Sequence, residues 1–476
     1  MDAEQFKKYG YELIDWVSEY FQDIETYPVK SQVSTKEILS KLPTHPPQDS
    51  EDFEKIFKDF NKIIMPGITH WQSPNFFAYF PANNSFPSIL GELLTSALGT
   101  QCMIWETSPA AAELEEVTMK WLAEMIGIPE TFSGVIQDTA STATLCSILT
   151  AREKYSENNI NENGFANKDK FVVYCSSEAH SSIEKAVKIA GIGKKHLRKI
   201  AVDKNYAMNT DELEIAINKD LKNDFIPLCV VGALGTTGAT AIDPISKIGE
   251  ICRKYKIWYH VDAAFAGTAL ILPEMRWMSE GIELADTFVF NPHKWMFTNF
   301  DCSAYFVKDR DALIKTFEIM PEYLKTGHDS QVNNYRDWGI QLGRRFRALK
   351  LWFVLRSFGV KNLQEKIRFH LKLASDLVIK IKQNPDFEIL APVHLNLLCF
   401  RYNPANLTDK KILNRLNDNL LTELNHTGKI YLTHTKLNDN FAIRMCIGQT
   451  NVTEKHISDA WELIQNKALE ILEKYK

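Results

Sequence analysis

The chain has 476 residues, of which 45% are hydrophobic, 11% aromatic and 24% charged, and its formal net charge is −5. That length and apolar content predict two or three structural units around a large buried core, and they exclude a disordered or fibrous chain. The mild acidity comes without a clustered basic excess, which argues against binding to nucleic acid or to an anionic membrane surface.

The apolar runs and the cysteines predict a cytoplasmic protein. The longest apolar stretch, residues 225–234, contains Pro227 and is too short for a membrane span of about 20 residues, so we expect a buried strand there. The first residues lack the basic region and apolar run of a secretory signal. The eight cysteines form neither a CxxC pair nor a metal-ligand spacing with histidine, so reduced core thiols and no metal site are expected.

The chain opens with two predicted helices that precede any strand. Residues 3–25 carry a wide apolar stripe at helical spacing. A connection interrupted by prolines follows, and a second helix spans about 51–64 and ends at Met65-Pro66-Gly67. Because two helices cannot form a core alone, we expect them to pack on another body, such as a second subunit. The stripe consists of Phe6, Tyr9, Leu13, Trp16, Val17, Tyr20 and Ile24.

From about residue 85 the pattern alternates between strands and helices. One helix has Ser108 as its N-cap, Pro109 at its first position and Gly127 beyond its end. Helices are also predicted at 210–222 and 245–255. The alternation predicts an α/β fold with a mostly parallel sheet, whose ligands bind at the carboxyl ends of the strands. The apolar strands are expected at 171–175, 198–202, 227–234, 257–261, 287–290 and 304–307.

The last part of the chain predicts a smaller α+β domain. Helices are expected at 349–358 and 363–383, weak strands at 393–401 and 441–447, and a closing helix from about Thr453. The predicted organisation is therefore an N-terminal helical segment over 1–84, a large domain over 85–348 and a small C-terminal domain over 349–476.

The strongest chemical signal is a lysine that directly follows a predicted strand. Residues 287–295 read TFVFNPHKW, so Lys294 comes after an Asn-Pro turn and is flanked by His293 and Trp295. An amine at this edge of the sheet can be held in a partly desolvated pocket. An arbitrary lysine is usually a solvated surface residue, but these neighbours favour a functional one.

A strand that ends in a carboxylate supplies the second signal. Residues 257–264 read IWYHVDAA, and Asp262 precedes Lys294 by one strand-to-strand step of an α/β sheet. An aspartate there could also cap a helix or bind a metal. Paired with the lysine, it meets the requirement of pyridoxal phosphate (PLP), whose pyridinium nitrogen stays protonated beside a carboxylate.

Two weaker signals follow other strands. Residues 134–142, GVIQDTAST, turn from an extended segment into a helix whose first N–H groups and hydroxyls suit a phosphate, although such residues are usually only caps. His180 follows the strand at 171–175. A lone histidine is more often structural, but over a pyridine ring it could stack on the cofactor and meet a substrate carboxylate.

These segments, in this order, resemble the aromatic L-amino-acid decarboxylases, which are PLP-dependent decarboxylases of fold type I. The resemblance covers nearly the whole chain, and the combination of NPHKW with HVDAA is highly specific. It implies decarboxylation of tryptophan, 5-hydroxytryptophan, dihydroxyphenylalanine, phenylalanine or tyrosine to the arylalkylamine and carbon dioxide. The other matching segments are GITHW at 67–71, FFAYFP at 76–81, TSPA at 107–110, ELE at 113–115, GIQLGRRFR at 339–347 and AW at 460–461.

The resemblance also implies roles for individual residues. Lys294 would bind PLP covalently, Asp262 would hold the pyridinium nitrogen, Ala264 would pack beneath the ring and His180 would stack above it. Family members are homodimers with an interleaved N-terminal segment, which would cover the apolar stripe of the first helix. The remaining implied cofactor contacts are Ala140, Ser141, Asn291 and His293 at the phosphate and Thr237 near the phenolic side.

The proton donor implied by the resemblance is Tyr323, in a polar, aperiodic stretch typical of loops that close over active sites. Composition alone would equally fit a solvated connection. In relatives that convert the acid to an aldehyde, this tyrosine is typically Phe or the stacked histidine is typically Asn. The chain therefore has the decarboxylating pair, Tyr323 and His180.

An aromatic pocket is implied for the substrate side chain. Gly343 leaves room for a larger ring, whereas Ala82 replaces a hydroxyl-bearing Thr, which could weaken selection for ring hydroxyls. Gln101 and Met103 replace Ile and Phe at positions that the partner subunit contributes. The implied pocket residues are Trp71, Tyr79, Phe80, Pro81, Ala82, Gln101, Met103 and Gly343.

Other functions are weighed against this one. An aldehyde synthase and a histidine or acidic amino-acid decarboxylase of the same family are alternatives, although an acidic substrate would need a cationic pocket. A non-catalytic PLP-binding member would be expected to lose Lys294 or Tyr323. An oxidoreductase would need a dinucleotide fingerprint, which the sequence lacks.

Overall fold

The computed structural model describes residues 1–165, 170–319, 331–404 and 407–475. The chain divides into two compact units, which are treated separately below. Unit 1 comprises Met1–Pro81, Ser375–Leu390 and Leu398–Lys476, and unit 2 comprises Ala82–Ala374 and Ala391–Leu397. The three-part division expected from the sequence stays a prediction.

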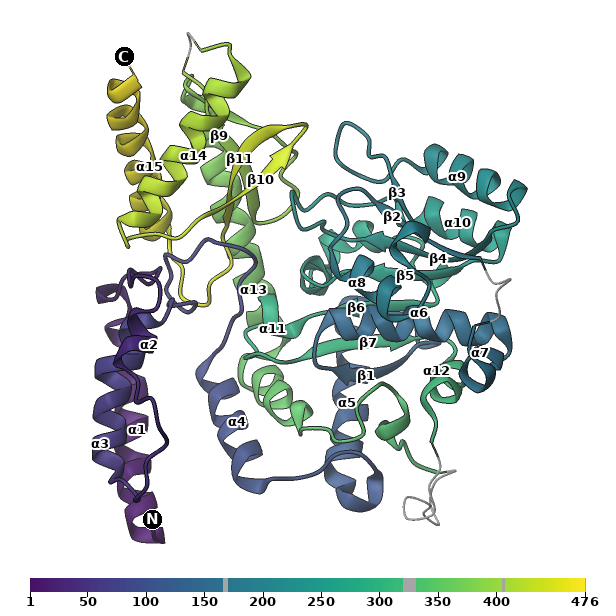
Figure 1. The fold of residues 1–476 in the computed structure, drawn as a ribbon, viewed down its shortest axis with the longest axis horizontal. Helices are drawn as coiled ribbons and strands as arrows, with labels where there is room; N and C mark the ends of the chain where they lie inside the picture. The colour runs from purple at the N-terminus through teal and green to yellow at the C-terminus, as the bar shows by residue number, and fades with distance from the viewer. Residues whose placement is uncertain (166–169, 320–330, 405–406, 476) are drawn as a thin grey trace. The chain divides into compact units, whose positions relative to one another are not determined.

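The core of unit 2 is a seven-stranded sheet with the order β1-β7-β6-β5-β4-β2-β3 (Figure 1). Strand β7 runs antiparallel to both of its neighbours, and the other described pairs in this sheet are parallel. The expected mostly parallel sheet is therefore confirmed. The strands are β1 (Ser133–Gln137), β2 (Phe171–Ser176), β3 (Leu197–Ile200), β4 (Ile226–Ala233), β5 (Trp258–Asp262), β6 (Thr287–Phe290) and β7 (Ser303–Val307).

Helices cover both faces of this sheet. On one face Val173 and Cys175 pack against α6 and α8 in a shared apolar cluster. Side chains alternate along a strand, so Tyr174 points to the other face, where its hydroxyl donates to Asp220 of α9 (2.9 Å). The helices of unit 2 are α4 (Phe86–Leu98), α5 (Pro109–Ile126), α6 (Ala140–Ser156), α7 (Asn159–Asn163), α8 (Ser182–Ile189), α9 (Thr210–Lys222), α10 (Ile245–Tyr255), α11 (Pro292–Trp295) and α12 (Arg310–Phe317).

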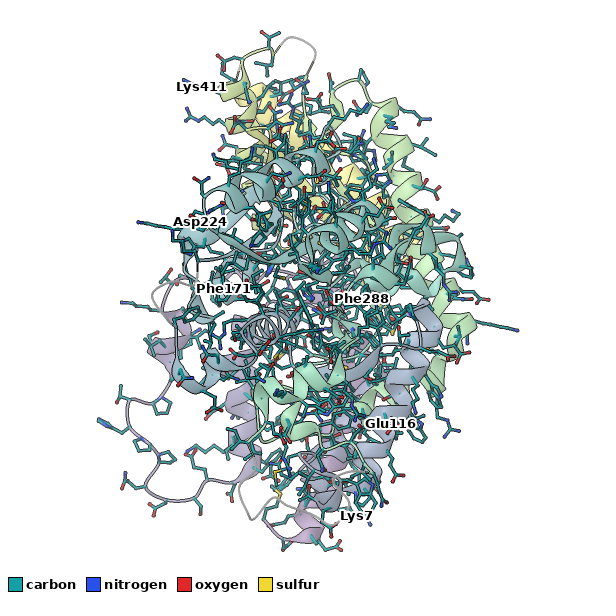
Figure 2. The ribbon with its side chains drawn as sticks, turned by 90° about the vertical axis from the view of Figure 1, so that its right-hand side faces the viewer. Lys7, Glu116, Phe171, Asp224, Phe288 and Lys411 are labelled. Carbon is teal, nitrogen blue, oxygen red and sulfur yellow. The ribbon has the colours of Figure 1, made fainter. Side chains whose placement is uncertain are left out.

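The interior of unit 2 is apolar and closely packed. Phe171 and Phe288 point into it, whereas Asp224 lies at its surface (Figure 2). The long helix α13 (Arg347–Gln383) is broken at Gly359, whose φ of 67° and ψ of 162° are not helical. Only glycine adopts that conformation easily, which explains why the sequence predicts two helices here.

Unit 1 contains the N-terminal helices and a four-stranded sheet with the order β10-β11-β9-β8. Helices α1 and α3 pack on each other through aromatic rings, with Tyr9 and Phe53 at 4.6 Å between centroids. None of the residues of α1 is buried, although the structure describes all of them. The elements are α1 (Ala3–Gln22), α2 (Glu37–Lys41), α3 (Phe53–Asp59), β8 (Phe387–Ile389), β9 (Leu397–Tyr402), α14 (Lys410–His426), β10 (Thr433–Leu437), β11 (Asn440–Cys446) and α15 (Glu454–Tyr475).

The cysteines and the apolar stretches were the two sequence features used above to predict the environment of the chain. All eight cysteines are buried and none forms a disulfide, as expected for core thiols. Among the residues that the structure describes, no helix has the length and apolar character needed to cross a membrane.

Candidate active site

Six strands of the unit 2 sheet, all except β7, run in the same direction, so their carboxyl ends lie at one edge. Strand β5 ends at Asp262, and β6 is followed directly by α11, which carries Lys294. Strand β2 precedes the turn with His180, β4 precedes Thr237, and β1 precedes Ala140 at the start of α6. Because the carboxyl ends of parallel strands meet at one edge, the predicted cofactor residues come together there.

The segment around Lys294 is a single helical turn held by hydrogen bonds. Its N–H donates to Asn291 O at 2.9 Å. His293 is tied to the start of β7, since the N–H of Cys302 donates to His293 Nδ1 at 2.9 Å. Burial, helped by the Lys294 charge, lowers the pKa of His293 to about 3. His293 is therefore neutral at pH 7, with its proton on Nε2, which makes it a donor toward an acceptor at the sheet edge.

Asp262 is fixed by backbone bonds between the ends of β5 and β6. Its Oδ1 accepts the N–H of Ala264 at 3.0 Å. The Ala263 N–H donates to Val289 O at 2.9 Å, and the Asn291 N–H donates to Ala264 O at 3.1 Å. The carboxylate and the lysine segment are thus attached to each other through the backbone, and Asp262 is only 9% exposed.

His180 lies in the electrostatic field of both groups. Desolvation lowers its pKa, the charge of Asp262 raises it, and the charges of Lys294 and Lys185 lower it. The N–H of Ser182 donates to His180 Nδ1 at 3.2 Å, and the Ser182 hydroxyl lies 2.8 Å from the same nitrogen. Nδ1 is therefore an acceptor, and in the neutral ring the proton is on Nε2.

Several groups at this edge could hold a phosphate. The first N–H groups of α6, at Ala140 and Ser141, have no acceptor within the helix, and the helix N-terminus favours an anion. The buried Asn291 Oδ1 has no hydrogen-bond partner among the described residues. An amide can present either its oxygen or its nitrogen, so this orphaned group fits a ligand that completes its bonding. An amine, a carboxylate, an imidazole and a phosphate site together fit PLP.

The last two predicted residues near the cofactor are Thr237 and Tyr323. Thr237 is exposed in a turn after β4, where the N–H groups of Gly235 and Thr236 both donate to Ala241 O, at 3.0 and 2.9 Å. Tyr323, the predicted proton donor, lies outside the residues that the structure describes.

The predicted substrate-pocket residues divide between the two units. Trp71, Tyr79, Phe80 and Pro81 belong to unit 1. There the Trp71 ring stacks on Tyr79 at 5.6 Å between centroids. The Tyr79 hydroxyl is 3.3 Å from that of Tyr431.

The other predicted pocket residues, Ala82, Gln101, Met103 and Gly343, belong to unit 2. The N–H of Arg344 donates to Gln101 Oε1 at 2.8 Å. A Cβ on Gly343 would lie 3.4 Å from Gln101 Nε2. Gln101 and Gly343 border a cavity of about 420 Å³. A larger cavity of about 760 Å³ in this unit contains none of the predicted site residues.

Sequence reasoning missed two buried acids near these segments. Asp243 accepts the N–H groups of Ala233 and Met208, at 2.8 and 2.7 Å, and so fixes the end of β4. Burial raises its pKa to about 7. Glu115 forms a buried ion pair with Arg344, 2.6 Å between Oε1 and Nη2. Glu115 lies in the segment ELE and Arg344 in the segment GRRFR. Both segments match the resembled family, and this match was the only indication of the pair in the sequence.

The fold is that of the PLP-dependent enzymes of fold type I. The chain belongs to the pyridoxal-dependent decarboxylases, because the model of the pyridoxal-dependent decarboxylase conserved domain matches residues 36–403. Its cofactor is PLP, and the protein is a carboxy-lyase.

Relatives match over nearly their whole length. Phenylacetaldehyde synthase from Arabidopsis thaliana is 42% identical over 485 residues, which cover 100% of this chain and 98% of that protein. Tyrosine decarboxylase 3 from Petroselinum crispum is 42% identical over 486 residues, 99% of this chain and 93% of that protein. The crystal structure of Oryza sativa TDC with PLP and tryptamine has a TM-score of 0.96 and 34% identity, and 99% of each chain is covered.

Proposed function

We propose that the protein decarboxylates an aromatic L-amino acid to the corresponding arylalkylamine, with Lys294 as the residue that binds PLP covalently. The observation that carries the proposal is the meeting of Lys294, Asp262 and His180 at one edge of the sheet, where the charges of the first two act on the third. The named activities of the relatives, phenylacetaldehyde synthase and tyrosine decarboxylase, support an aromatic substrate.

Each of the predicted site residues is proposed to have a separate role in the reaction. PLP, when bound, supplies an electron sink for the carbon–carbon bond that breaks. Asp262 keeps the proton on the pyridine nitrogen, because its negative charge favours the protonated form. His180, with its proton on Nε2, orients the substrate carboxylate. Tyr323 returns a proton to the substrate Cα, and the low pKa of His293 keeps its Nε2–H a neutral donor to the phosphate.

Substrate selection is proposed to depend on the aromatic residues of unit 1. Trp71 and Tyr79 stack with planes 15° apart, and Trp71 lies 4.4 Å from Phe76 between centroids. Such a surface favours a planar side chain. The substrate class then comprises tryptophan, 5-hydroxytryptophan, dihydroxyphenylalanine, phenylalanine and tyrosine.

An aldehyde synthase is the second candidate, because one relative with 42% identity is a phenylacetaldehyde synthase. The residues at the two positions that separate these outcomes, His180 and Tyr323, favour release of the amine. The aldehyde route also needs an oxidant such as oxygen and releases ammonia, so the two reactions have different products.

The active form is proposed to be a homodimer, which the surface of α4 supports. Its buried face carries the small residues Ser88, Gly91 and Thr95. A Cβ on Gly91 would lie 2.7 Å from Lys350 Cα, so α4 and α13 approach closely there. The outer face exposes five large apolar side chains, a pattern that a second copy of the chain would cover. The side chains are Phe86, Leu90, Leu93, Leu94 and Leu98.

A cytoplasmic location is also proposed. It is supported by the eight buried cysteines, which form no disulfide. Free thiols of this kind are typical of reducing compartments.

The proposed function predicts a covalent cofactor and a specific product. The purified protein with PLP should show a yellow absorption band that borohydride removes, and Lys294→Ala should lack that band. Incubation with a mixture of amino acids should then yield an arylalkylamine and carbon dioxide, measured by mass spectrometry, with aldehyde and ammonia as minor products. Tyr323→Phe should lower amine formation by about 100-fold or more, the usual contribution of a positioned acid, and should raise the aldehyde fraction.

Three results would contradict the proposal. A borohydride-sensitive band in Lys294→Ala would exclude Lys294 as the attachment residue. Amine release at an unchanged rate by Tyr323→Phe would exclude Tyr323 as the proton donor. Turnover of glutamate or histidine, with none of the aromatic acids, would exclude the substrate class.

A further inference from the structure

Trp295, the residue after Lys294, is fully buried and is tied to a helix distant in the sequence. Its indole N–H donates to His370 Nδ1 on α13 at 2.9 Å. The two rings lie nearly parallel, with planes 13° apart and centroids at 6.3 Å. On another side the indole stacks on Phe265 at 5.0 Å. Figure 1 shows α11 beside α13, which brings His370 close to the turn that carries Lys294.

His370 also contacts the next aromatic residue, Phe297. The ring of Phe297 is fully buried and meets His370 edge to face, with centroids at 6.0 Å and planes 64° apart. Phe297 has a φ of 52°, an uncommon conformation for a residue with a side chain. The Ser85 hydroxyl donates to Phe297 O at 2.7 Å and helps to hold this bend. His370, only 2% exposed, thus contacts both aromatic side chains that follow Lys294.

The turn itself is too short to hold Lys294 without such anchors. Helix α11 has four residues, Pro292–Trp295, and one isolated turn of helix is unstable in water. On the N-terminal side the anchor is His293, whose Nδ1 accepts the Cys302 N–H. On the C-terminal side the anchor is the hydrogen bond between Trp295 and His370. These two side-chain contacts therefore hold the turn that carries Lys294 at its two ends.

We propose that His370 is a positioning residue for Lys294 and acts through the indole of Trp295. The inference rests on the proposed function, in which Lys294 binds PLP. This role requires a hydrogen-bond acceptor at the position of His370 Nδ1. Removing the acceptor leaves the buried indole N–H of Trp295 without a partner, and a shift of the turn relieves that cost. A shift of the turn moves the lysine amine away from the cofactor aldehyde, where small displacements are costly.

The test compares variants that keep or remove the acceptor. His370→Asn places an amide oxygen near the position of Nδ1, whereas His370→Leu fills the space without an acceptor. Trp295→Phe removes the donor and keeps an aromatic ring on Phe265, so it serves if His370→Leu does not fold. Two quantities are measured: the affinity of the apoprotein for PLP, and the rate at which an amine-selective reagent labels Lys294, by peptide mass spectrometry. The buried Lys350, whose side chain has 0% exposure, is the internal reference for global opening.

His370→Leu and Trp295→Phe should bind PLP about threefold to tenfold more weakly than the wild type, as expected for loss of one buried hydrogen bond. Both should raise the ratio of Lys294 to Lys350 labelling by about threefold, because the lysine then samples more exposed positions. His370→Asn should remain close to the wild type in both measurements.

Ser147→Ala is the matched control. It removes the acceptor of another buried indole in the same unit, since Trp258 Nε1–H donates to Ser147 Oγ at 2.9 Å. Trp258 begins β5, at the end of that strand away from Asp262. This variant should lose stability while its PLP affinity and labelling ratio stay at wild-type values.

Two outcomes would overturn the inference. One is wild-type PLP affinity and labelling in His370→Leu, or in Trp295→Phe where the former does not fold. The other is an equal defect in His370→Asn, which would show that the acceptor is not the cause. Neither outcome affects the proposed function, which instead fails if Lys294→Ala keeps the borohydride-sensitive band.

Discussion

The buried imidazole of His260 is kept neutral by its surroundings in the sheet. His260 lies in β5 with 0% exposure. One ring nitrogen is 3.1 Å from Thr144 Oγ1 and the other is 2.9 Å from Thr287 Oγ1. Two hydroxyls can serve one donor and one acceptor, which matches a neutral imidazole. Burial lowers the pKa of His260 to about 4, although the nearby Asp262 charge opposes the shift.

This shift predicts a pH dependence of stability. The pKa of an unfolded histidine is about 6.5, so between about pH 6.5 and pH 4 the unfolded chain binds a proton that folded His260 does not. Stability is then present above pH 6.5 and falls as the pH falls toward 4. Between pH 7 and pH 5 His260 should account for a loss of about 2 kcal/mol. Asp243 acts with the opposite sign, because its folded pKa is raised to about 7.

The measurement therefore compares two proteins at two pH values. His260→Gln can replace hydrogen bonds to the threonines but cannot titrate. Urea unfolding of the two apoproteins is followed by circular dichroism. The difference in the free energy of unfolding between the wild type and His260→Gln should decrease by about 2 kcal/mol from pH 7 to pH 5. A difference that stays constant or grows on acidification would show that His260 is not held neutral.

At the scale of elements, the Glu115–Arg344 pair joins α5, the end of β1 and the segment before α13. Glu115 Oε1 accepts the N–H of Ile136 at 2.8 Å, and Arg344 Nη2 donates to Ile136 O at 2.8 Å. The guanidinium also lies over the ring of Tyr335 at 4.8 Å. The carboxylate and the guanidinium are both satisfied by more than each other, which is the condition under which a buried ion pair is tolerated.

Breaking this pair on one side should cost much more than removing both partners. Arg344→Leu should lower the free energy of unfolding by about 3 kcal/mol or more, because it leaves the buried Glu115 charge uncompensated. The double variant Glu115→Leu/Arg344→Leu should lose less than the sum of the two single losses. Lys120→Ala is the control on the same helix, since its ion pair with Glu116 is exposed and is worth about 0.5 kcal/mol. Additive losses measured by urea unfolding would contradict the coupling.

The same scale explains which elements the sequence could predict. Helices α9 and α10 have the bounds expected from their apolar periodicity, and the strands expected in unit 2 agree to within two residues, whereas β9 begins four residues later than expected. Helix α4 was missed because its pattern is inverted, with Gly91 and Thr95 buried and the leucines exposed. Strand β10 was missed because its exposed residues give it a polar sequence, THTKL.

Individual side-chain contacts between segments distant in the sequence could not be predicted from local patterns. Lys294 and Asp262 could be predicted to lie near each other because each stands at the carboxyl end of a strand, and parallel strands bring these ends together. The hydrogen bond from Trp295 to His370 joins residues 75 positions apart, and no local pattern reports it. The assignment of Trp71 and Gly343 to different units is likewise a property of the folded chain.

For the whole molecule, the exposed face of α4 leads to a prediction about assembly. Leu90 and Leu94 lie one helical turn apart and are 48% and 45% exposed. The double substitution Leu90→Glu/Leu94→Glu should convert a dimer to a monomer, because burying two carboxylates without partners in an apolar interface is costly. Light scattering after size-exclusion chromatography measures the mass. Ile215→Glu, which replaces a 59% exposed apolar residue on α9, is the control and should leave the dimer intact.

Assembly and activity should be linked if the sequence-based roles of Gln101 and Met103 are right. Both residues are predicted to complete the active site of the partner subunit, so the monomeric variant should lose decarboxylation of aromatic acids while it still binds PLP through Lys294. The yellow band that borohydride removes measures the binding of PLP through Lys294 independently of turnover. A monomer with full activity would show that one chain supplies the whole site, and an undiminished dimer in the double variant would show that the face of α4 is not the interface.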